Sequence, residues 1–380
     1  MKDRIYVCHT FYHVYITCVK ELLLTANDVK GNNIAHKPQK VRLGASIVLS
    51  NMSTDFGDLK NRLKEAGLFS EIFEYDEKRA DFFPELKKFY TDSGSRLINM
   101  VNRIIYTKKL GKAQIPFLPV DFRTYRDVYV YCDSDPIGYY LNYAKIPYHA
   151  IEDGLNCLVI FDAARYDNRG FFGLKAWMSA RNLIFIQNGY GKYCLDMEVN
   201  NISLLANPGF NFIEQSREEM IYALDKNSLD TLLAIFITDI ENLKQKLNAK
   251  SDMKQKVLIL TEPLCDISTR IKVFGKIIDQ YGRPNNKEAT IIIKPHPMDT
   301  ADYQKFFPGH IVLDSKFPME MLNLIPYLYF NRVVSIFTVP SGIKFAGEVI
   351  SLGRDYKDDP DDPLPFRQKL DRYIEELFIL

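Results

Sequence analysis

The most constraining feature of the sequence is a run of β-branched residues that stops at two prolines. Residues 290–293 read TIII, and the chain continues as Lys294, Pro295, His296 and Pro297. The run predicts a buried strand, and the strand must end there because neither proline donates a backbone N–H and both fix φ. We therefore expect His296 at the carboxyl end of a buried strand, where open α/β sheets bind their ligands.

Short apolar runs alternate with helical patterns along the whole chain, which is typical of parallel α/β sheets. The runs expected to be strands are residues 5–8, 45–50, 72–75, 127–132, 148–151, 182–187, 257–260, 290–293, 310–313 and 333–336. The segments expected to be helical are residues 11–24, 58–66, 81–105, 138–144, 211–250, 270–280, 319–324, 340–349 and 366–377.

The alternation occurs in two series, and a length of 380 residues suits two domains. We expect a Rossmann-like domain over residues 1–215, a helical connection over 216–250 and a second Rossmann-like domain over 251–360. A last helix over 361–380 follows a proline-rich break, and its packing on the first domain is left open.

Composition restricts the classes of partner. The net charge of +1 gives no reason to expect a nucleic acid. The six cysteines include no CxxC pair, so neither a zinc site nor a disulfide framework is expected. The sequence shows no signal-peptide pattern and no apolar window of about 18 residues. We therefore expect a cytoplasmic protein, and leave open both a homodimer and peripheral association with the inner face of a membrane.

Two motifs suggest acid–base chemistry. An imidazole such as that of His296 can donate to a phosphate or protonate a leaving group, although a structural turn is the plainer reading. Glu152 and Asp153 follow an expected strand, and adjacent carboxylates on an extended chain point to opposite sides, so only one can face a ligand. Gly154 permits a sharp turn beside them. One carboxylate there could take a proton from a hydroxyl, and an acidic β-turn is the alternative.

Two further motifs carry less information. Ser335 and Thr338 lie between an expected strand and an expected helix, where hydroxyls and backbone N–H groups form anion sites, but such residues are also ordinary helix caps. Asp133 and Asp135 form a DxD triplet whose carboxylates share one face of an extended segment. An Asp-Pro turn explains the triplet equally simply, so we expect no metal site.

Taken in order, these motifs resemble those of bacterial sialyltransferases, most closely glycosyltransferase family 52, the lipooligosaccharide and capsule sialyltransferase group. The likeness rests on Glu152 to Gly154, on His296-Pro297, on Pro318-Met319-Glu320 and on Ser335 to Thr338, and their order and rough spacing agree over most of the chain. The resemblance implies an α/β fold of the GT-B type, with two Rossmann-like domains facing each other across a cleft. It also implies a metal-independent, inverting transfer of sialic acid from CMP-sialic acid to a glycan hydroxyl, such as that of a terminal galactose, without a cofactor.

The resemblance also implies residue roles. Glu152 is our first choice for the general base, Asp153 is the second, and Asp266 is a rival because the resemblance also allows the carboxylate to come from that segment. His296 would contact the CMP phosphate and assist its departure. Ser335 and Thr338 would hold phosphate oxygens, and Glu320 the cytidine ribose. The other residues expected beside the nucleotide are Lys294, Pro297 and Gly154, and those expected on the acceptor side are His9, His13 and Asn51.

Three other functions remain open. The first is a GT-B enzyme that uses a nucleotide-diphosphate sugar, such as a glucosyltransferase. The second is a polyol-phosphate transferase of the teichoic-acid type, which carries a similar KxHP motif and also moves CMP-activated units. The third is a sugar-nucleotide-binding protein without catalytic activity.

Overall fold

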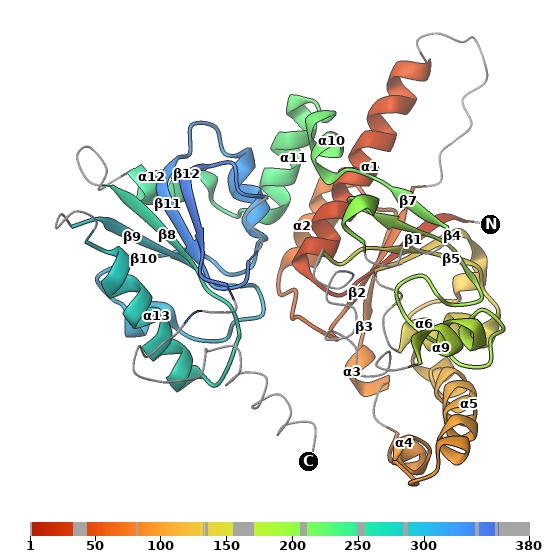
Figure 1. The fold of residues 1–380 in the computed structure, drawn as a ribbon. Helices are drawn as coiled ribbons and strands as arrows, with labels where there is room; N and C mark the ends of the chain where they lie inside the picture. Colours follow the sequence, from red (N-terminus) through yellow and green to blue (C-terminus); the bar gives the residue numbers. More distant parts are fainter. Residues whose placement is uncertain are drawn as a thin grey trace. The chain divides into compact units, whose positions relative to one another are not determined.

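The computed structural model describes residues 2–32, 44–80, 83–131, 133, 136–154, 171–205, 211–248, 255–283, 288–338, 342–353 and 356. The chain divides into two compact units, Met1–Leu232 and Leu233–Leu380. Each unit is built on one parallel sheet with helices packed against it, as Figure 1 shows. Asp135 and the helix expected at 366–377 lie outside the described residues.

The sheet of unit 1 has the strand order β3-β2-β1-β4-β5-β6-β7, and all neighbouring strands are parallel. Its strands are β1 Lys2–Cys8, β2 Ser46–Ser50, β3 Glu71–Tyr75, β4 Tyr125–Tyr131, β5 Tyr148–Ile151, β6 Cys194–Val199 and β7 Phe212–Glu214. Its helices are α1 Phe11–Asn32, α2 Leu59–Ala66, α3 Glu77–Ala80, α4 Lys87–Tyr90, α5 Arg96–Ala113, α6 Ile137–Ala144, α9 Phe172–Ser179 and α10 Arg217–Tyr222, with short 3₁₀ turns between some of them. Helix α11 Lys226–Phe236 contains the boundary between the two units.

Strand β1 is covered on both faces, which explains why its sequence is apolar without alternation. Ile5 and Val7 lie in the same core cluster as side chains of α6. Tyr6, on the opposite face, donates its hydroxyl to Glu21 of α1 over 2.7 Å. The two faces of β1 therefore hold α1 on one side of the sheet and α6 on the other.

Unit 2 has a five-stranded parallel sheet in the order β10-β9-β8-β11-β12. Its strands are β8 Lys256–Leu260, β9 Thr290–Lys294, β10 Ile311–Val312, β11 Phe330–Ser335 and β12 Ala346–Ser351, and its helices are α12 Ile240–Asn248, α13 Ile267–Tyr281, α14 Tyr303–Phe306 and the 3₁₀ helix η7 Met319–Leu324. Val273, Phe274 and Ile277 of α13 pack on β8 and β9 in one core cluster. In unit 1 the strand order reverses between β1 and β4, and in unit 2 between β8 and β11. The carboxyl ends of the strands at such a reversal are where α/β proteins bind their ligands.

Nine of the ten expected strands are confirmed, and the one expected at residues 182–187 is wrong. Residues 184–187 are buried, but the backbone of the segment bonds to the end of α9 instead of a neighbouring strand: the Leu183 N–H donates to the Met178 carbonyl over 3.0 Å and the Ile186 N–H to Ser179 Oγ over 3.2 Å. Asn182 and Asn188 at its two ends have positive φ, which breaks the extended conformation. The next strand of the sheet is β6, which the sequence reading missed.

The helix expected at residues 340–349 is also wrong in its described part. Strand β12 pairs in parallel with β11, from Phe330 opposite Ala346 to Ser335 opposite Ser351. Gly347 has low helix propensity, and the exposed edge of β11 offers the segment a full ladder of hydrogen bonds. The helical pattern over 81–105 is divided among a 3₁₀ turn, α4 and α5. Within the described residues, no helix combines the length and the hydropathy needed to cross a lipid bilayer.

Candidate active site

The carboxyl ends of β1 and β2 in unit 1 meet at a buried carboxylate, Glu77. Its Oε2 lies 2.8 Å from His9 Nε2 and accepts from Ser50 Oγ over 2.5 Å. Its Oε1 accepts from the Ile137 N–H, at the start of α6, over 3.1 Å. The side chain is fully buried. Glu77 thus joins the ends of two strands to a helix N-terminus, where a negative charge is favoured. The sequence reading missed it, although it lies two residues after a predicted strand.

His13 continues this network towards the acidic turn. Its Nδ1 accepts the backbone N–H of His9 over 3.0 Å, so the proton of the neutral ring resides on Nε2. Nε2 pairs with Asp153 Oδ1, whose side chain is 40% exposed. The ring stacks on Tyr131, with centroids 4.0 Å apart. Burial lowers the pKa of His13, and the charge of Asp153 opposes that shift. The structure therefore brings together three predicted residues, His9, His13 and Asp153.

Glu152 lies on the other side of the same turn, as expected for adjacent residues. It is 4% exposed, and Oε2 accepts the Asn200 N–H over 2.6 Å. Oε1 makes no hydrogen bond to the described residues. Burial raises the pKa of Glu152, against the opposing effects of Asn200 and Arg217. Gly154 has φ of 126°, a conformation that L side chains rarely adopt. A carboxylate with a raised pKa and one oxygen held by the backbone suits general-base chemistry.

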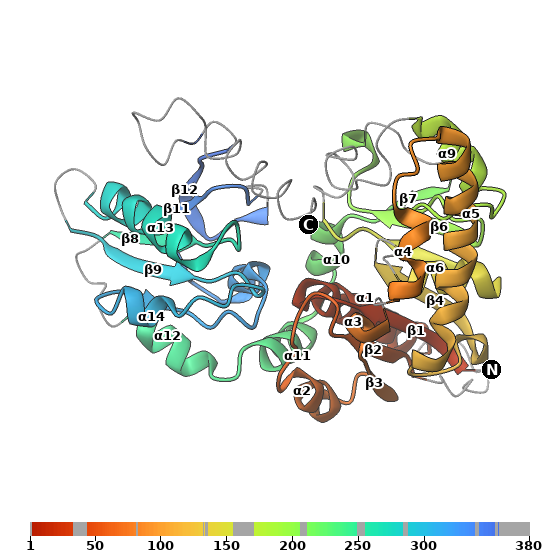
Figure 2. The same ribbon diagram turned by 90° about the horizontal axis from the view of Figure 1, so that it is seen from below.

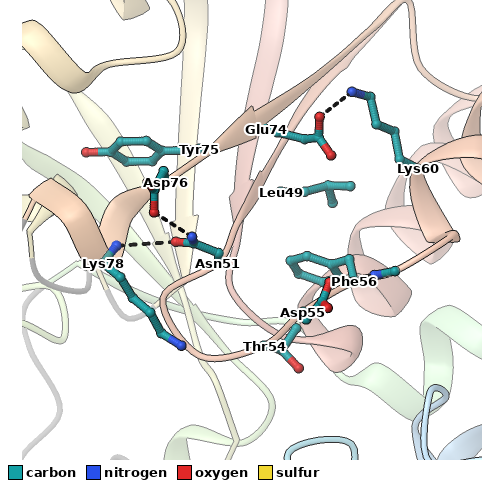
Figure 3. Close-up of a pocket in the computed structure, with 11 residues that line it drawn as sticks. Leu49, Asn51, Thr54, Asp55, Phe56, Lys60, Glu74, Tyr75, Asp76 and Lys78 are labelled. Atoms are coloured by element: carbon teal, nitrogen blue, oxygen red, sulfur yellow. Dashed lines mark hydrogen bonds and ion pairs between the residues drawn. The ribbon is translucent and has the colours of Figure 1, made fainter.

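Asn51, expected on the acceptor side, lines a cavity of about 420 Å³ at the ends of β2 and β3. Its amide donates to Asp76 Oδ1 over 2.6 Å and accepts the Lys78 N–H over 3.3 Å, as Figure 3 shows. Phe56 also lines the cavity, whereas the ring of Tyr75, another lining residue, belongs to the buried core of unit 1. Asp76 and Lys78 flank Glu77 in sequence, so this cavity adjoins the His9 network.

Asp133 of the DxD triplet serves the fold. It is buried, and its Oδ1 accepts the Asn188 and Gly189 N–H groups over 2.5 and 3.2 Å. Its Oδ2 accepts from Tyr148 OH over 2.8 Å. Oδ1 is therefore occupied by the loop that replaces the strand expected at 182–187, and Oδ2 by a side chain of β5. In the described part of the chain, no group of three or more His, Cys, Asp or Glu side chains is placed to hold a metal ion.

In unit 2 the Pro-His-Pro turn follows β9 as predicted. His296 Nδ1 accepts the Met298 N–H over 3.1 Å, so the neutral ring carries its proton on Nε2. The His296 carbonyl accepts the Asp299 N–H over 2.8 Å, and its own N–H lies 3.4 Å from Thr261 Oγ1 at the end of β8. The turn therefore holds the imidazole in one tautomer and ties its backbone to a neighbouring strand.

Asp299, which the sequence reading missed, anchors this turn. Oδ1 accepts from Arg270 Nη1 over 2.5 Å and from the Ala301 N–H over 3.0 Å. Oδ2 accepts from Thr261 Oγ1 over 3.0 Å and Tyr303 OH over 2.8 Å. The carboxylate is fully buried beside a buried guanidinium. The signal was an acidic residue three positions after a strand-end histidine, but its partners lie too far along the chain to be seen locally.

Lys294, the last residue of β9, is buried, and its Nζ donates to the Pro295 carbonyl over 2.8 Å and lies over the Phe317 ring. Burial lowers its pKa to about 7, while the charges of Asp314 and Glu320 oppose the shift. Burial also raises the pKa of Glu320 on η7. Two residues expected beside the nucleotide thus interact with each other, and Pro297 is partly exposed after them.

The Ser335–Thr338 motif is arranged differently from the expectation. Thr338 Oγ1 donates to Glu262 Oε1 over 2.7 Å, and the Phe337 N–H donates to the same carboxylate over 3.0 Å. The buried Ser335 Oγ donates to the Thr338 carbonyl over 3.4 Å. Burial raises the pKa of Glu262. Of the two hydroxyls that we expected to hold a phosphate, that of Thr338 donates to an internal carboxylate that the sequence did not reveal, and that of Ser335 donates to a backbone carbonyl.

Asp266, the rival base, caps α13. Its Oδ1 accepts the Thr269 N–H over 3.0 Å and the Ser268 hydroxyl over 2.8 Å. These hydrogen bonds, with Thr269 the larger contributor, lower its pKa to about 2. A carboxylate with such a low pKa is a weak proton acceptor near neutral pH, so the geometry favours Glu152.

Comparison with known proteins places the chain in a family. The model of glycosyltransferase family 52 matches residues 91–346. An α/β-galactoside α-2,3-sialyltransferase from Photobacterium phosphoreum is structurally similar, with 11% identity, a TM-score of 0.51 and coverage of 100% of this chain and 96% of that one. A 2,6-sialyltransferase from Photobacterium sp. JT-ISH-224, solved with CMP and lactose, shares 13% identity with a TM-score of 0.57, covering 100% and 77%.

A curated relative, an uncharacterized protein of Haemophilus influenzae, is 30% identical over 86 residues, so the match spans 21% of this chain and 26% of that protein. The low identities of the solved structures establish a shared fold, which with the two parallel sheets is of the GT-B type. The family model covers well over half of the chain, and this protein therefore belongs to glycosyltransferase family 52.

Proposed function

We propose that this protein is an inverting, metal-independent sialyltransferase that moves sialic acid from CMP-sialic acid to a hydroxyl of a glycan. The observation that carries the proposal is the chemistry of two strand-end turns. Unit 1 offers Glu152, a carboxylate with a raised pKa, and unit 2 offers His296 with a proton on Nε2. Membership in glycosyltransferase family 52 supports the reaction class, and the similar fold solved with CMP and lactose supports this pair of substrates.

The proposed reaction is a single displacement. The acceptor hydroxyl oxygen forms a bond to the anomeric carbon of sialic acid while the bond from that carbon to the CMP phosphate oxygen breaks. Glu152 takes the hydroxyl proton, and CMP leaves with the bonding electron pair as a phosphate monoester. One displacement at one carbon inverts its configuration. A base on one face and hydrogen-bond donation to the leaving group on the other are what such a transition state requires.

On the nucleotide side, we assign the phosphate contact to His296 through Nε2–H. Ser335 and Thr338 are weaker candidates because their hydroxyl protons are engaged inside unit 2. Glu320 remains our candidate for the cytidine ribose, with Lys294 behind it as a buried counter-charge.

On the acceptor side, we assign sugar binding to the cavity that Asn51 lines. The aromatic ring of Phe56 with amide and carboxylate groups suits a sugar, which has apolar faces and many hydroxyls. The cavity adjoins the network that positions His13 and Asp153. A terminal galactose of a surface glycan, such as a lipooligosaccharide or a capsule, fits this proposal.

The test is CMP release from CMP-sialic acid in the presence of lactose, with and without EDTA. Release should need lactose, resist EDTA and fall at least about 100-fold in His296→Ala, the usual minimum for losing a positioned proton donor. His310→Ala, another partly exposed histidine of unit 2, is the matched control and should keep wild-type turnover. If the wild-type protein releases CMP no faster than His296→Ala does, the proposal is contradicted. UDP release from UDP-glucose would support the diphosphate-sugar alternative instead.

A further inference from the structure

Unit 1 carries a surface where two helices expose large apolar side chains. Leu97, Ile98 and Val101 lie on α5, and Phe171, Leu174 and Trp177 lie on α9 or directly before it. Leu97 is 75% exposed and Phe171 70%. We call these six residues the α5–α9 surface. Isolated apolar residues are ordinary on a protein surface, but a group of this size marks an interaction site.

The two halves of this surface lie side by side. The Arg96 guanidinium at the start of α5 lies over the Phe171 ring, 5.7 Å from its centroid. Further along α5, Ile104 packs on the core cluster that contains Met178 of α9. Figure 2 shows α9 beside one end of α5. The apolar side chains of both helices therefore belong to one region of unit 1.

The exposure of α5 follows from how the helix docks. Its second half is pressed on α6, where a Cβ on Gly111 would come within 2.6 Å of the Tyr139 carbonyl oxygen. Leu110 is buried at the same contact. Residues 97 and 98 each lie about one helical turn before residue 101, in the first half of the helix. The apolar residues in the second half of α5 are therefore packed in the core, and those in the first half are left exposed.

The same region is cationic. Helix α5 contains Arg96, Arg103, Lys108, Lys109 and Lys112 and neither Asp nor Glu. Arg181, just after α9, places its guanidinium 3.9 Å from the centroid of the Trp177 ring, and α4 adds exposed Lys87 and Lys88. Within residues 83–113 and 171–181, the described stretches that contain α4, α5 and α9, the acids are Glu85 and Asp92. Cations therefore outnumber acids around the apolar group, although the chain as a whole is nearly neutral.

We infer that the α5–α9 surface binds an anionic lipid membrane. Leucine, phenylalanine and tryptophan side chains enter the headgroup region, while arginine and lysine beside them meet lipid phosphates. Each cation near an anionic surface strengthens binding. A second copy of the chain suits the surface less well, because a two-fold contact would place the same cations against one another. The inference is independent of the proposed transferase activity.

Trp177 makes a direct test available, since it is the one tryptophan in the chain. The full-length protein is mixed with vesicles of phosphatidylcholine alone or of phosphatidylcholine with phosphatidylglycerol, and its emission is recorded. We expect a blue shift and quenching by brominated lipid with the anionic vesicles, reversed by high salt. No donor or acceptor sugar is needed, so this result does not depend on catalysis.

Variants identify the surface. Leu97→Ser with Val101→Ser should weaken vesicle binding at least about 10-fold, since both lose apolar area that would be buried. Arg96→Gln with Arg181→Gln should weaken it about 30-fold, from roughly 1 kcal/mol per cation. Leu195→Ser with Ile213→Ser, comparably exposed on β6 and β7, is the matched control and should bind like wild type. Circular dichroism checks that each variant is folded.

Three results would overturn the inference. They are equal binding to neutral and anionic vesicles, an equal loss in the control variant, and no change of Trp177 emission with either vesicle. An emission shift that grows with protein concentration in the absence of lipid, with a dimer seen by light scattering, would assign the surface to a second copy instead.

Discussion

Asp299→Asn tests whether the turn that presents His296 is held by a buried ion pair. The carboxylate accepts four hydrogen bonds, from Arg270, Thr261, Tyr303 and Ala301. An amide keeps one accepting oxygen, turns an NH₂ group towards donors and leaves the buried guanidinium without a counter-charge. Breaking a buried pair on one side costs about 3–5 kcal/mol. For a unit of about 150 residues, that lowers the Tm by roughly 6–20 °C.

The assay is calorimetry with circular dichroism, alongside CMP release measured well below the Tm. Asp302→Asn is the matched control, because Asp302 caps α14 through the Lys305 N–H and asparagine caps equally well. It should change the Tm by no more than about 2 °C. A Tm of Asp299→Asn within that range would refute the anchoring role. We also expect reduced turnover in Asp299→Asn at low temperature, since the His296 carbonyl and Thr261 are both tied to Asp299.

Three further predictions concern proton chemistry and the acceptor. The pKa of Lys294 falls from 10.5 in the unfolded chain to about 7 in the folded protein, so the unfolded state binds more protons between these pH values. The free energy of unfolding should therefore rise with pH from about 7 towards 10. Thermal melts of Lys294→Met should lack this rise, and a rise equal to that of the wild type would contradict the prediction. Glu152→Gln should lower kcat at least about 100-fold and remove the acid limb of the pH profile, because a carboxylate with a raised pKa loses its base form as pH falls. Asp153→Asn should lower kcat less than Glu152→Gln does, and Asp266→Asn should lower it least. If Asp266→Asn lowers kcat more than Glu152→Gln, the base is Asp266 at the start of α13. Asn51→Ala should raise KM for lactose several-fold and leave the slow hydrolysis of CMP-sialic acid unchanged, and an equal change in both would remove this cavity from the acceptor site.

The parallel fold could be read from the sequence because its central strands are continuous apolar runs. The run at 290–293 and its prolines fixed both the strand and the place of His296. Residues 183–186, LIFI, form a similar apolar run, yet they lie in a buried loop because Asp133, about 50 positions earlier, binds the N–H groups that follow at residues 188 and 189. The local sequence pattern of this segment correctly predicts that it is buried, but it does not predict which groups accept hydrogen bonds from its backbone N–H groups.

The candidate site was predictable at its strand ends and not in its supports. His9, His13, Glu152 and Asp153 follow strands, so position alone singled them out. Glu77 and Glu262 act through partners at sequence separations of 27 to 76 residues, and no local motif marks them. The Thr338 hydroxyl points into unit 2 because it donates to Glu262, and the sequence around Thr338 does not show this partner.

The contacts of Glu77 also bear on how unit 1 is made. Its partners lie at residues 9, 50 and 137, so a nascent chain released only as far as α3 contains this carboxylate but lacks the N–H that α6 supplies. Burying it at that stage would leave a charge with an unfilled hydrogen bond, which is costly. We expect the end of the sheet that carries His9 and His13 to close only after α6 has been synthesised and docked. A fragment that stops before residue 137 should therefore keep this end solvated and exchange its amide protons quickly, even where β1 and β2 have paired.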